Sequence, residues 1–167
     1  LALLLAAGRS APAAAQAEVQ AWDAAQLHAQ QGEYDAAVAE YVDLLRREPY
    51  RYDQVETSLL HVGETPASAQ GMARALGAAL EQERAAGDEA VVAALSRLAA
   101  ACALQRGQAQ EGLEIVAGLP DGQQGEDLLF WYAARCEAQG HPGVAARAYS
   151  LFADREQDSP YLFTALL

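Results

Sequence analysis

The chain contains no lysine. All 11 of its basic residues are arginines, set against 23 aspartates and glutamates, which gives a formal net charge of -12. A protein that binds nucleic acid needs a basic face to neutralise phosphates, so this charge balance argues against a nucleic-acid partner. Two origins of the missing lysine stay open: a GC-rich genome, or a salt-adapted host in which an acidic surface keeps the protein soluble.

Aromatic and β-branched residues are also scarce. Aromatic residues make up 7% of the 167 residues, while hydrophobic residues, many of them alanine, make up 52%. No segment alternates apolar and polar residues for long enough to indicate a strand, and alanine favours helices. The composition therefore predicts an all-α fold that is large enough to bury a core.

Motifs for catalysis and metal binding are lacking as well. The three histidines, His28, His61 and His141, have no second histidine or cysteine at metal-ligand spacing. The sequence has no G-x-S-x-G, no H-E-x-x-H and no glycine loop that would cradle a phosphate. We therefore expect a non-catalytic protein with no catalytic residue, no cofactor and no metal site.

Two cysteines, Cys102 and Cys136, occupy nearly equivalent places on two expected helices. Packed helix axes usually lie about 8–10 Å apart, whereas a disulfide needs Cα atoms within about 7 Å. We therefore predict two buried free thiols, although an exported protein would permit a disulfide.

The first residues differ from the rest of the chain. Leu1–Gly8 is an apolar run too short to span a membrane, and Ala15-Gln16-Ala17 has the small-x-small pattern of a signal-peptidase site. Two interpretations of residues 1–17 stay open, a signal-peptide remnant or disordered lead and a frayed first helix. The first implies an exported protein with no integral membrane span. At the other end, we expect residues 159–167 to begin a further, truncated helix at Ser159-Pro160.

Between these ends, glycines, prolines and helical periodicity predict about four helix pairs over residues 18–158. The expected helices are Glu18–Gln31, Tyr34–Arg47, Tyr50–His61, Pro66–Ala86, Glu89–Arg106, Gln108–Ala117, Glu126–Gln139 and Pro142–Arg155. The small residues Ala37, Ala133 and Ala145 are expected where two helices touch. Gly118, Pro120, Gly122 and Gly125 predict one loose linker.

The segment QGEYDAAVAEYVDLLRREP, from Gln31 to Pro49, resembles the second half of a tetratricopeptide repeat. It has a glycine turn at Gly32, a small residue at Ala37 and an aromatic residue at Tyr41. The turn glycines Gly32, Gly63, Gly107 and Gly140 have spacings of 63 − 32 = 31, 107 − 63 = 44 and 140 − 107 = 33. Two of these are close to the roughly 34-residue period of the family. The resemblance covers Glu18 to the end, and Asp158-Ser159-Pro160-Tyr161 is similar to repeat boundaries in exported, periplasmic bacterial members.

The resemblance implies a right-handed superhelical array of antiparallel helix pairs, a tetratricopeptide-like α-solenoid with a concave groove. Aromatic residues in that groove would anchor a partner, and Arg97 would meet an acidic group. The groove positions that it implies are Trp22, Gln26, Tyr50, Asp53, Arg97, Phe130 and Glu137. Alternatively, Trp22 and Phe130 fill gaps between helix pairs. The family's carboxylate clamp needs lysine, so we do not expect that activity here.

The sequence thus predicts a non-catalytic protein-binding scaffold of the bacterial cell envelope, in the periplasm or on the cell surface, whose partner is a peptide or helix of another protein. The alternative is the amino-terminal interaction domain of a larger exported enzyme, a peptidase or cell-wall hydrolase, with its catalytic part elsewhere. A third interpretation is a structural spacer with an empty groove. The identity of the partner and the oligomeric state stay open.

Overall fold

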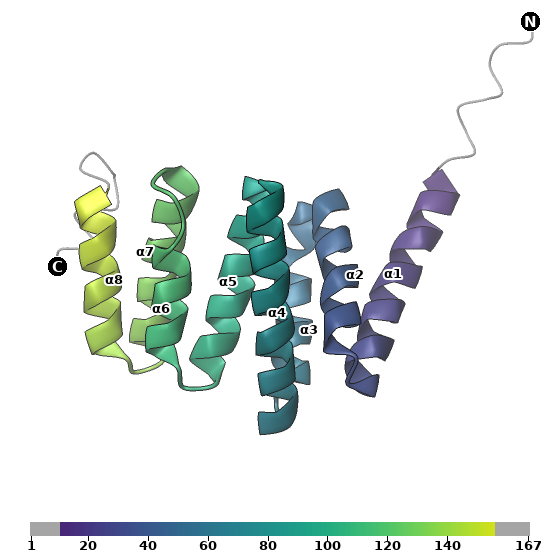
Figure 1. Cartoon of the computed structure of the whole chain (residues 1–167), viewed down its shortest axis with the longest axis horizontal. Helices are drawn as coiled ribbons and strands as arrows, with labels where there is room; N and C mark the ends of the chain where they lie inside the picture. Colours follow the sequence, from purple (N-terminus) through teal and green to yellow (C-terminus); the bar gives the residue numbers. More distant parts are fainter. Residues whose placement is uncertain (1–10, 156–167) are drawn as a thin grey trace, which may run out of the picture.

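The computed structural model describes the backbone of residues 11–155 and the side chains of residues 20–155. Within this part of the chain the fold is all-α, as predicted, and no strand is present (Figure 1). The elements are α1 (Ala11–Gln31), α2 (Tyr34–Arg47), the 3-10 helix η1 (Pro49–Arg51), α3 (Tyr52–Val62), α4 (Pro66–Ala86), α5 (Glu89–Gln105), α6 (Ala109–Ala117), α7 (Gln123–Ala138) and α8 (Pro142–Arg155).

Helices that follow one another in the chain pack as neighbours. The closest pairs are α1 with α2, α5 with α6 and α7 with α8. Helix α4 departs from this scheme, because it packs against α2 and α5 more extensively than against α3. Sequence signals for a pair are weakest at this position, where the glycine spacing of 107 − 63 = 44 is also the longest.

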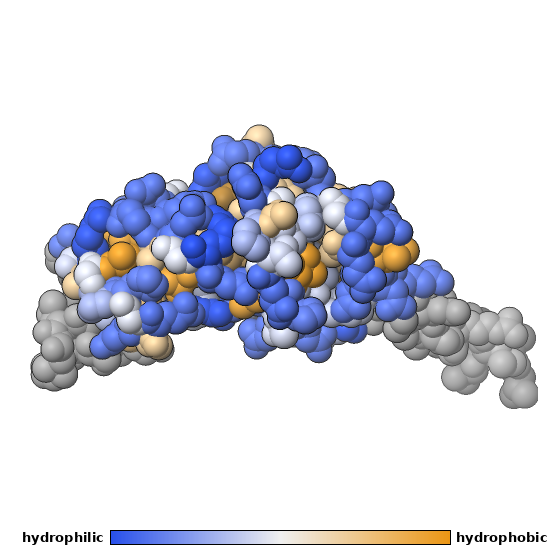
Figure 2. All heavy atoms as spheres, turned by 90° about the horizontal axis from the view of Figure 1, so that it is seen from below, coloured by the Kyte–Doolittle hydropathy of each residue, from blue (hydrophilic) through white to orange (hydrophobic). Residues whose placement is uncertain are grey.

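The helices form two layers. Figure 1 shows α2, α4 and α6 in front of α3, α5 and α7, and α5 contacts both α3 and α7. Seen from below, the described part of the molecule is thickest in its middle and tapers toward both ends (Figure 2). We call α3, α5 and α7 the inner layer, because an ion pair described below joins α3 to α7 across α5, which requires these helices to converge on that side.

The buried residues of the two layers form two apolar clusters, one around α2 to α5 and one around α5 to α8, and Leu128 packs against both. The predicted small contact residues are confirmed: Ala37 and Ala133 are 0% exposed and Ala145 is 3% exposed. Both cysteines are buried and free, which confirms the prediction for them.

Three expected helices, Tyr34–Arg47, Pro66–Ala86 and Pro142–Arg155, have the predicted bounds. The caps of α4 explain its clear signal. The Thr65 side chain accepts a hydrogen bond from the Ser68 N–H, and Gly87, whose φ of 77° suits glycine, caps the helix after Ala86. Asp88 then caps α5 by accepting a hydrogen bond from the Val91 N–H at 3.2 Å.

Other bounds differ for identifiable reasons. Helix α3 begins at Tyr52 because Pro49–Arg51 forms a separate 3-10 turn, held by hydrogen bonds from Tyr50 and Arg51 to the buried Glu48 carboxylate. Helix α7 begins at Gln123 rather than Glu126. Glu126 lies in the first turn of the helix, and its side chain reaches back and accepts a hydrogen bond from the Gly122 N–H at 3.2 Å.

Helix α1 begins at Ala11 instead of Glu18, with Pro12 in its first turn, where a missing N–H costs no helical hydrogen bond. Residues 11–17 thus continue the first helix. Residues 1–10 and 156–167 lie outside the described part, and so does the helix expected from Ser159. Removal of residues 1–17 as a signal peptide stays a prediction.

The linker between α6 and α7 is fixed rather than loose. The Arg155 guanidinium, from the end of α8, donates hydrogen bonds to the carbonyl oxygens of Ala117 at 2.8 Å and Leu119 at 3.3 Å. It also forms an ion pair with Asp121 at 2.9 Å. Long-range contacts of this kind leave no local sequence signal, which explains why the glycines and proline alone suggested mobility.

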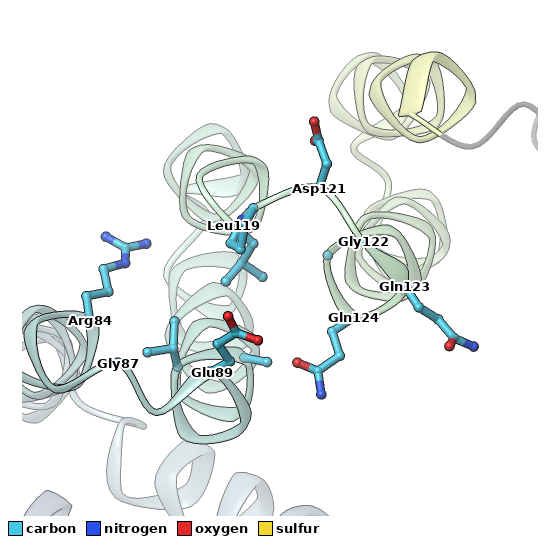
Figure 3. A pocket seen from close by; sticks show the side chains of 12 residues that line it. Arg84, Gly87, Glu89, Leu119, Asp121, Gly122, Gln123 and Gln124 are labelled. Carbon is cyan, nitrogen blue, oxygen red and sulfur yellow. The ribbon is translucent and has the colours of Figure 1, made fainter.

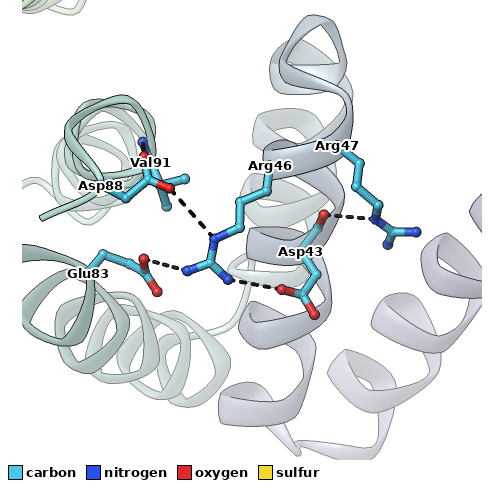
Figure 4. Close-up of polar contacts among 6 residues, drawn as sticks. All are labelled: Asp43, Arg46, Arg47, Glu83, Asp88 and Val91. Carbon is cyan, nitrogen blue, oxygen red and sulfur yellow. Dashed lines mark hydrogen bonds and ion pairs between the residues drawn. The ribbon is translucent and has the colours of Figure 1, made fainter. Parts of the chain in front are cut away.

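A second arginine joins three helices where α2 packs against α4. Arg46 donates hydrogen bonds to Asp43 of α2 and to the buried Glu83 of α4, and lies 3.9 Å from Asp88 at the start of α5 (Figure 4). The hydrogen bond to Glu83 is the main reason that the pKa of Arg46 is raised above its ordinary value. This network stabilises the contact of α4 with α2 and α5.

Candidate partner-binding face

Helix α5 is almost entirely apolar between its ends, and Arg97 is the one charged residue in its middle turns. The Arg97 guanidinium lies between two aromatic rings of the inner layer. Its central carbon is 4.1 Å from the ring centroid of Tyr52 on α3 and 4.8 Å from that of Trp131 on α7. Cation–π attraction to both rings restrains the position of the guanidinium.

A second row of side chains lies one helical turn further along the inner layer. Glu56 and Arg135 each follow a stacked aromatic residue by four positions, and they form an ion pair that joins α3 to α7. Ala101, four positions after Arg97 on α5, is 2% exposed. A small residue at this point of the middle helix leaves room for the two long side chains to meet across it.

A third row continues the same spacing. The Gln105 side-chain amide of α5 donates a hydrogen bond to the Leu60 carbonyl oxygen of α3 at 2.9 Å. Residues four apart on a helix lie on one face, so Arg97, Ala101 and Gln105 form a continuous stripe along the inner side of α5. The inner layer is therefore crossed by three successive rows of contacts between helices.

Arg97 has no polar partner among the residues whose side chains are described. Within the described residues its guanidinium makes no hydrogen bond and no ion pair, and its Nε is buried without an acceptor. By contrast, six other arginines, Arg46, Arg51, Arg84, Arg106, Arg135 and Arg155, form ion pairs. A partly desolvated cation without an acceptor is costly, and the two aromatic rings offset only part of that cost. Arg97 is only partly buried, and its terminal Nη1 and Nη2 groups, unlike Nε, are not among the buried atoms, so they are available to an external acceptor.

The surroundings keep Tyr52 neutral. Burial raises the pKa of the Tyr52 phenol above its ordinary value, the nearby Glu56 carboxylate raises it further, and the Arg97 cation opposes both effects. Tyr52 therefore stays protonated at neutral pH and presents an uncharged ring to Arg97. In the row of Tyr52, Arg97 and Trp131 and the row of Glu56, Ala101 and Arg135, the only formal charges are those of Arg97 and the Glu56–Arg135 pair.

The residues that the resemblance placed in a groove are dispersed. Trp22 packs edge-on against Tyr41 of α2, with ring centroids 5.7 Å apart, and Gln26 is half-buried on α1. Phe130 contacts Tyr149 and Phe152 of α8 at centroid distances of 5.7 and 5.5 Å, so it packs within the last helix pair. Both aromatic side chains thus pack against the second helix of their own pair, whereas the alternative interpretation placed them in gaps between pairs.

The remaining groove candidates lie at different places. Tyr50 is 77% exposed in η1, and its hydroxyl donates a hydrogen bond to Glu48. Asp53 is exposed in the first turn of α3. Glu137, exposed on α7, accepts a long hydrogen bond from the Tyr149 hydroxyl at 3.5 Å. We call Tyr52, Glu56, Arg97, Trp131 and Arg135 the stacked cluster. Among the residues proposed from the sequence, Arg97 is the one that lies in it.

Four cluster residues were not singled out in the sequence: Tyr52, Glu56, Trp131 and Arg135. Trp131 directly follows Phe130, and consecutive residues point about 100° apart on a helix. The sequence shows two adjacent aromatic residues without showing which one faces inward. One pattern in the sequence could have indicated these residues. An aromatic residue is followed four positions later by a charged residue in both helices, Tyr52 by Glu56 and Trp131 by Arg135.

None of the described helices is long and apolar enough to cross a membrane. Among the same residues, no three histidine, cysteine or acidic side chains are grouped so as to hold a metal ion. Comparison with protein-family models, with curated proteins and with solved structures finds no match for this chain.

Proposed function

We propose that this chain is a non-catalytic scaffold that binds a segment of another protein along its inner layer, with Arg97 as the contact for an acidic group. The observation that carries this proposal is the state of Arg97. It is held between Tyr52 and Trp131, yet no described residue accepts a hydrogen bond from it. A carboxylate would complete the site with charge-assisted hydrogen bonds at little cost in ordering, because the guanidinium is already positioned.

The scaffold in this proposal is a tetratricopeptide-like α-solenoid with a right-handed superhelix. Neighbouring helix pairs and small residues at helix contacts support it. Stacked helix pairs present an extended inner surface, which suits a peptide or helix of a partner. Export to the bacterial envelope is part of the same proposal and is supported by the pattern at Ala15-Gln16-Ala17.

The charge of the whole chain narrows the kind of partner. A protein with a net charge of -12 repels a strongly acidic segment at long range. Arg97, however, attracts a single acidic group at short range. We therefore propose a segment that is largely apolar or neutral and carries one isolated carboxylate.

Quantitative affinity capture from envelope extract tests this function. Arg97→Ala is compared with Arg74→Ala, which removes the same charge from an exposed position on α4. We expect wild type and Arg74→Ala to retain at least one common protein that Arg97→Ala loses, because only Arg97 contacts the partner. Truncating an interface anchor of this kind typically costs about 2 kcal/mol or more in binding.

Thermal unfolding of both variants provides the control, since Arg97→Ala must stay folded at the temperature of capture. An unchanged set of captured proteins in a folded Arg97→Ala variant would show that Arg97 is not the contact. In that case the inner layer would serve as a spacer, with Arg97 acting only in packing.

A further inference from the structure

A pocket of about 420 Å³ lies between the turn from α4 to α5 and the start of α7 (Figure 3). Its floor is apolar and consists of Val92, Ala93 and Leu119, which are all buried. Glu89 of α5 and Gln124 of α7 extend over it from opposite sides, as Figure 3 shows. The volume falls in the range of about 300–1,000 Å³ in which proteins hold small ligands, so one large side chain fits.

Both walls of this pocket are held by contacts described above. Arg155 fixes the linker that carries Leu119, and Asp88 caps the helix that carries Val92 and Ala93. Gly125 adds a close approach, because a Cβ there would lie 2.6 Å from the Pro120 carbonyl oxygen. The pocket is therefore preformed, and an entering group does not have to order its walls.

The pocket and the Arg97 site share one face of α5. Glu89 and Ala93 line the pocket, and Arg97 follows Ala93 by four residues. Residues four apart on a helix have Cβ atoms about 5–6 Å apart. An extended segment advances about 3.3 Å per residue, so two side chains that are two positions apart span this distance and point to the same side.

The pocket and the Arg97 site suit side chains of different chemistry. The pocket floor is apolar, and two charged residues lie at its rim: Glu89, which would repel an acidic side chain, and Arg84, whose guanidinium already forms an ion pair with Glu81. Asp121 points away from the pocket in Figure 3, toward its ion pair with Arg155. The carboxylate of a partner segment therefore belongs on Arg97, and the pocket favours an uncharged apolar side chain.

We infer that this pocket is the specificity subsite of the inner layer, which takes a large apolar side chain two positions from the carboxylate that docks on Arg97 in an extended partner segment. This inference rests on the proposed function. The inference adds a sequence preference for the partner segment. The preferred order is an acidic residue, any residue, then Leu, Phe or Trp, or the same pattern in reverse.

The test uses synthetic peptides and the whole chain. The peptides are seven residues long, acetylated and amidated, and built from Ala and Ser with one Asp. Each also carries Phe, or Ala as its control, at a distance of one to four positions before or after the Asp. Binding is measured by fluorescence polarisation. We expect the tightest binding for one order of Asp and Phe two positions apart, and at least about tenfold weaker binding when Ala replaces Phe.

Two variants locate the effect. Gln124→Trp places a large ring over the pocket. Gln123 also borders the pocket, but its side chain points away from it, so Gln123→Trp adds the same ring outside (Figure 3). We expect Gln124→Trp to remove the preference for Phe over Ala and Gln123→Trp to retain it. Arg97→Gln should weaken the Asp-Phe and Asp-Ala peptides alike.

The outcomes separate this inference from the proposed function. Equal binding of Phe and Ala peptides, with both dependent on Arg97, would overturn the subsite and leave the function intact. A Phe preference that survives in Gln124→Trp would place the subsite elsewhere and also overturn it. If free N-acetylphenylalanine amide binds as tightly as the peptide, the pocket is a small-molecule site and the inference is wrong. Peptide binding that is absent, or independent of Arg97, would contradict the function itself.

Discussion

At the scale of single residues, Gly112 shows how one missing side chain sets the packing of two helices. The Tyr132 ring of α7 is 0% exposed, and its hydroxyl donates a hydrogen bond to the Ala109 carbonyl oxygen of α6 at 2.7 Å. A Cβ on Gly112 would lie 2.1 Å from this hydroxyl oxygen. Gly112 therefore provides the space that Tyr132 needs to approach α6.

This contact predicts opposite effects for two glycine substitutions within helices. Gly112→Ala must displace the buried Tyr132 and disrupt its hydrogen bond, so we expect the free energy of unfolding to fall by about 1–3 kcal/mol. A Cβ added at Gly77 of α4 would meet nothing within 4 Å, and Gly77→Ala should raise the free energy of unfolding by roughly 0.5–1 kcal/mol through helix propensity. Urea unfolding of both variants measures the difference. Stabilisation by Gly112→Ala would show that Tyr132 does not occupy this space.

At the scale of elements, the inner layer is joined by contacts that skip a helix. The Glu56–Arg135 ion pair links α3 to α7, although α5 lies between them. The Glu56 side chain is 11% exposed and that of Arg135 is 27% exposed, so the pair is largely shielded from solvent. Such a pair fixes the separation of α3 and α7 across α5.

A double-mutant cycle tests the coupling of α3 to α7. Arg135→Met keeps an apolar stem but leaves the Glu56 carboxylate buried without its cation, so we expect a loss of roughly 1–4 kcal/mol in the free energy of unfolding. Adding Glu56→Met should restore much of this loss, because no unpaired charge is left. The control combines Arg135→Met with Asp23→Asn, an exposed residue on α1 at the other end of the helix array (Figure 1), whose effect should be additive. Additive effects of Glu56→Met and Arg135→Met would mean that the two helices are not coupled through this pair.

At the scale of the whole molecule, charge is unevenly balanced. The 23 acidic residues exceed the 11 arginines by 23 − 11 = 12, and many arginines already lie in ion pairs. The excess acids, including Asp35, Asp53 and Glu89, are exposed. Mutual repulsion among exposed like charges disfavours the compact state, whereas isolated surface ion pairs contribute only about 0–1 kcal/mol each.

The balance of these two effects predicts the response to salt. Raising the ionic strength from about 0.01 M to about 0.5 M shortens the screening length several-fold and weakens the long-range repulsion among the acids. The shielded pairs, such as Glu56–Arg135, are screened much less. We therefore expect the Tm to rise with sodium chloride, measured by circular dichroism at pH 7. A Tm that falls with salt would show that the ion pairs contribute more to stability than the repulsion takes away.

Local sequence signals were enough to predict the helices and most of their ends. Helical periodicity, Thr65 with Pro66, and Gly87 with Asp88 are such signals, because caps and glycine turns act within a few residues of the chain. The burial of Ala37, Ala133 and Ala145 was predictable for the same reason, since small apolar residues on the buried stripe of a helix mark close contacts. The free state of Cys102 and Cys136 followed from the spacing of packed helices.

The packing of the helices, by contrast, selects which side chains meet across the inner layer. Phe130 and Trp131 are equally aromatic and adjacent, and the rotation of α7 about its axis turns Phe130 toward α8 and Trp131 toward Arg97. That rotation is set by contacts summed over the whole helix, as is the reach of Arg155 to the linker from 36 residues away. Interactions of this kind join residues that are distant in sequence, so no local pattern encodes them, and the candidate site follows from the fold.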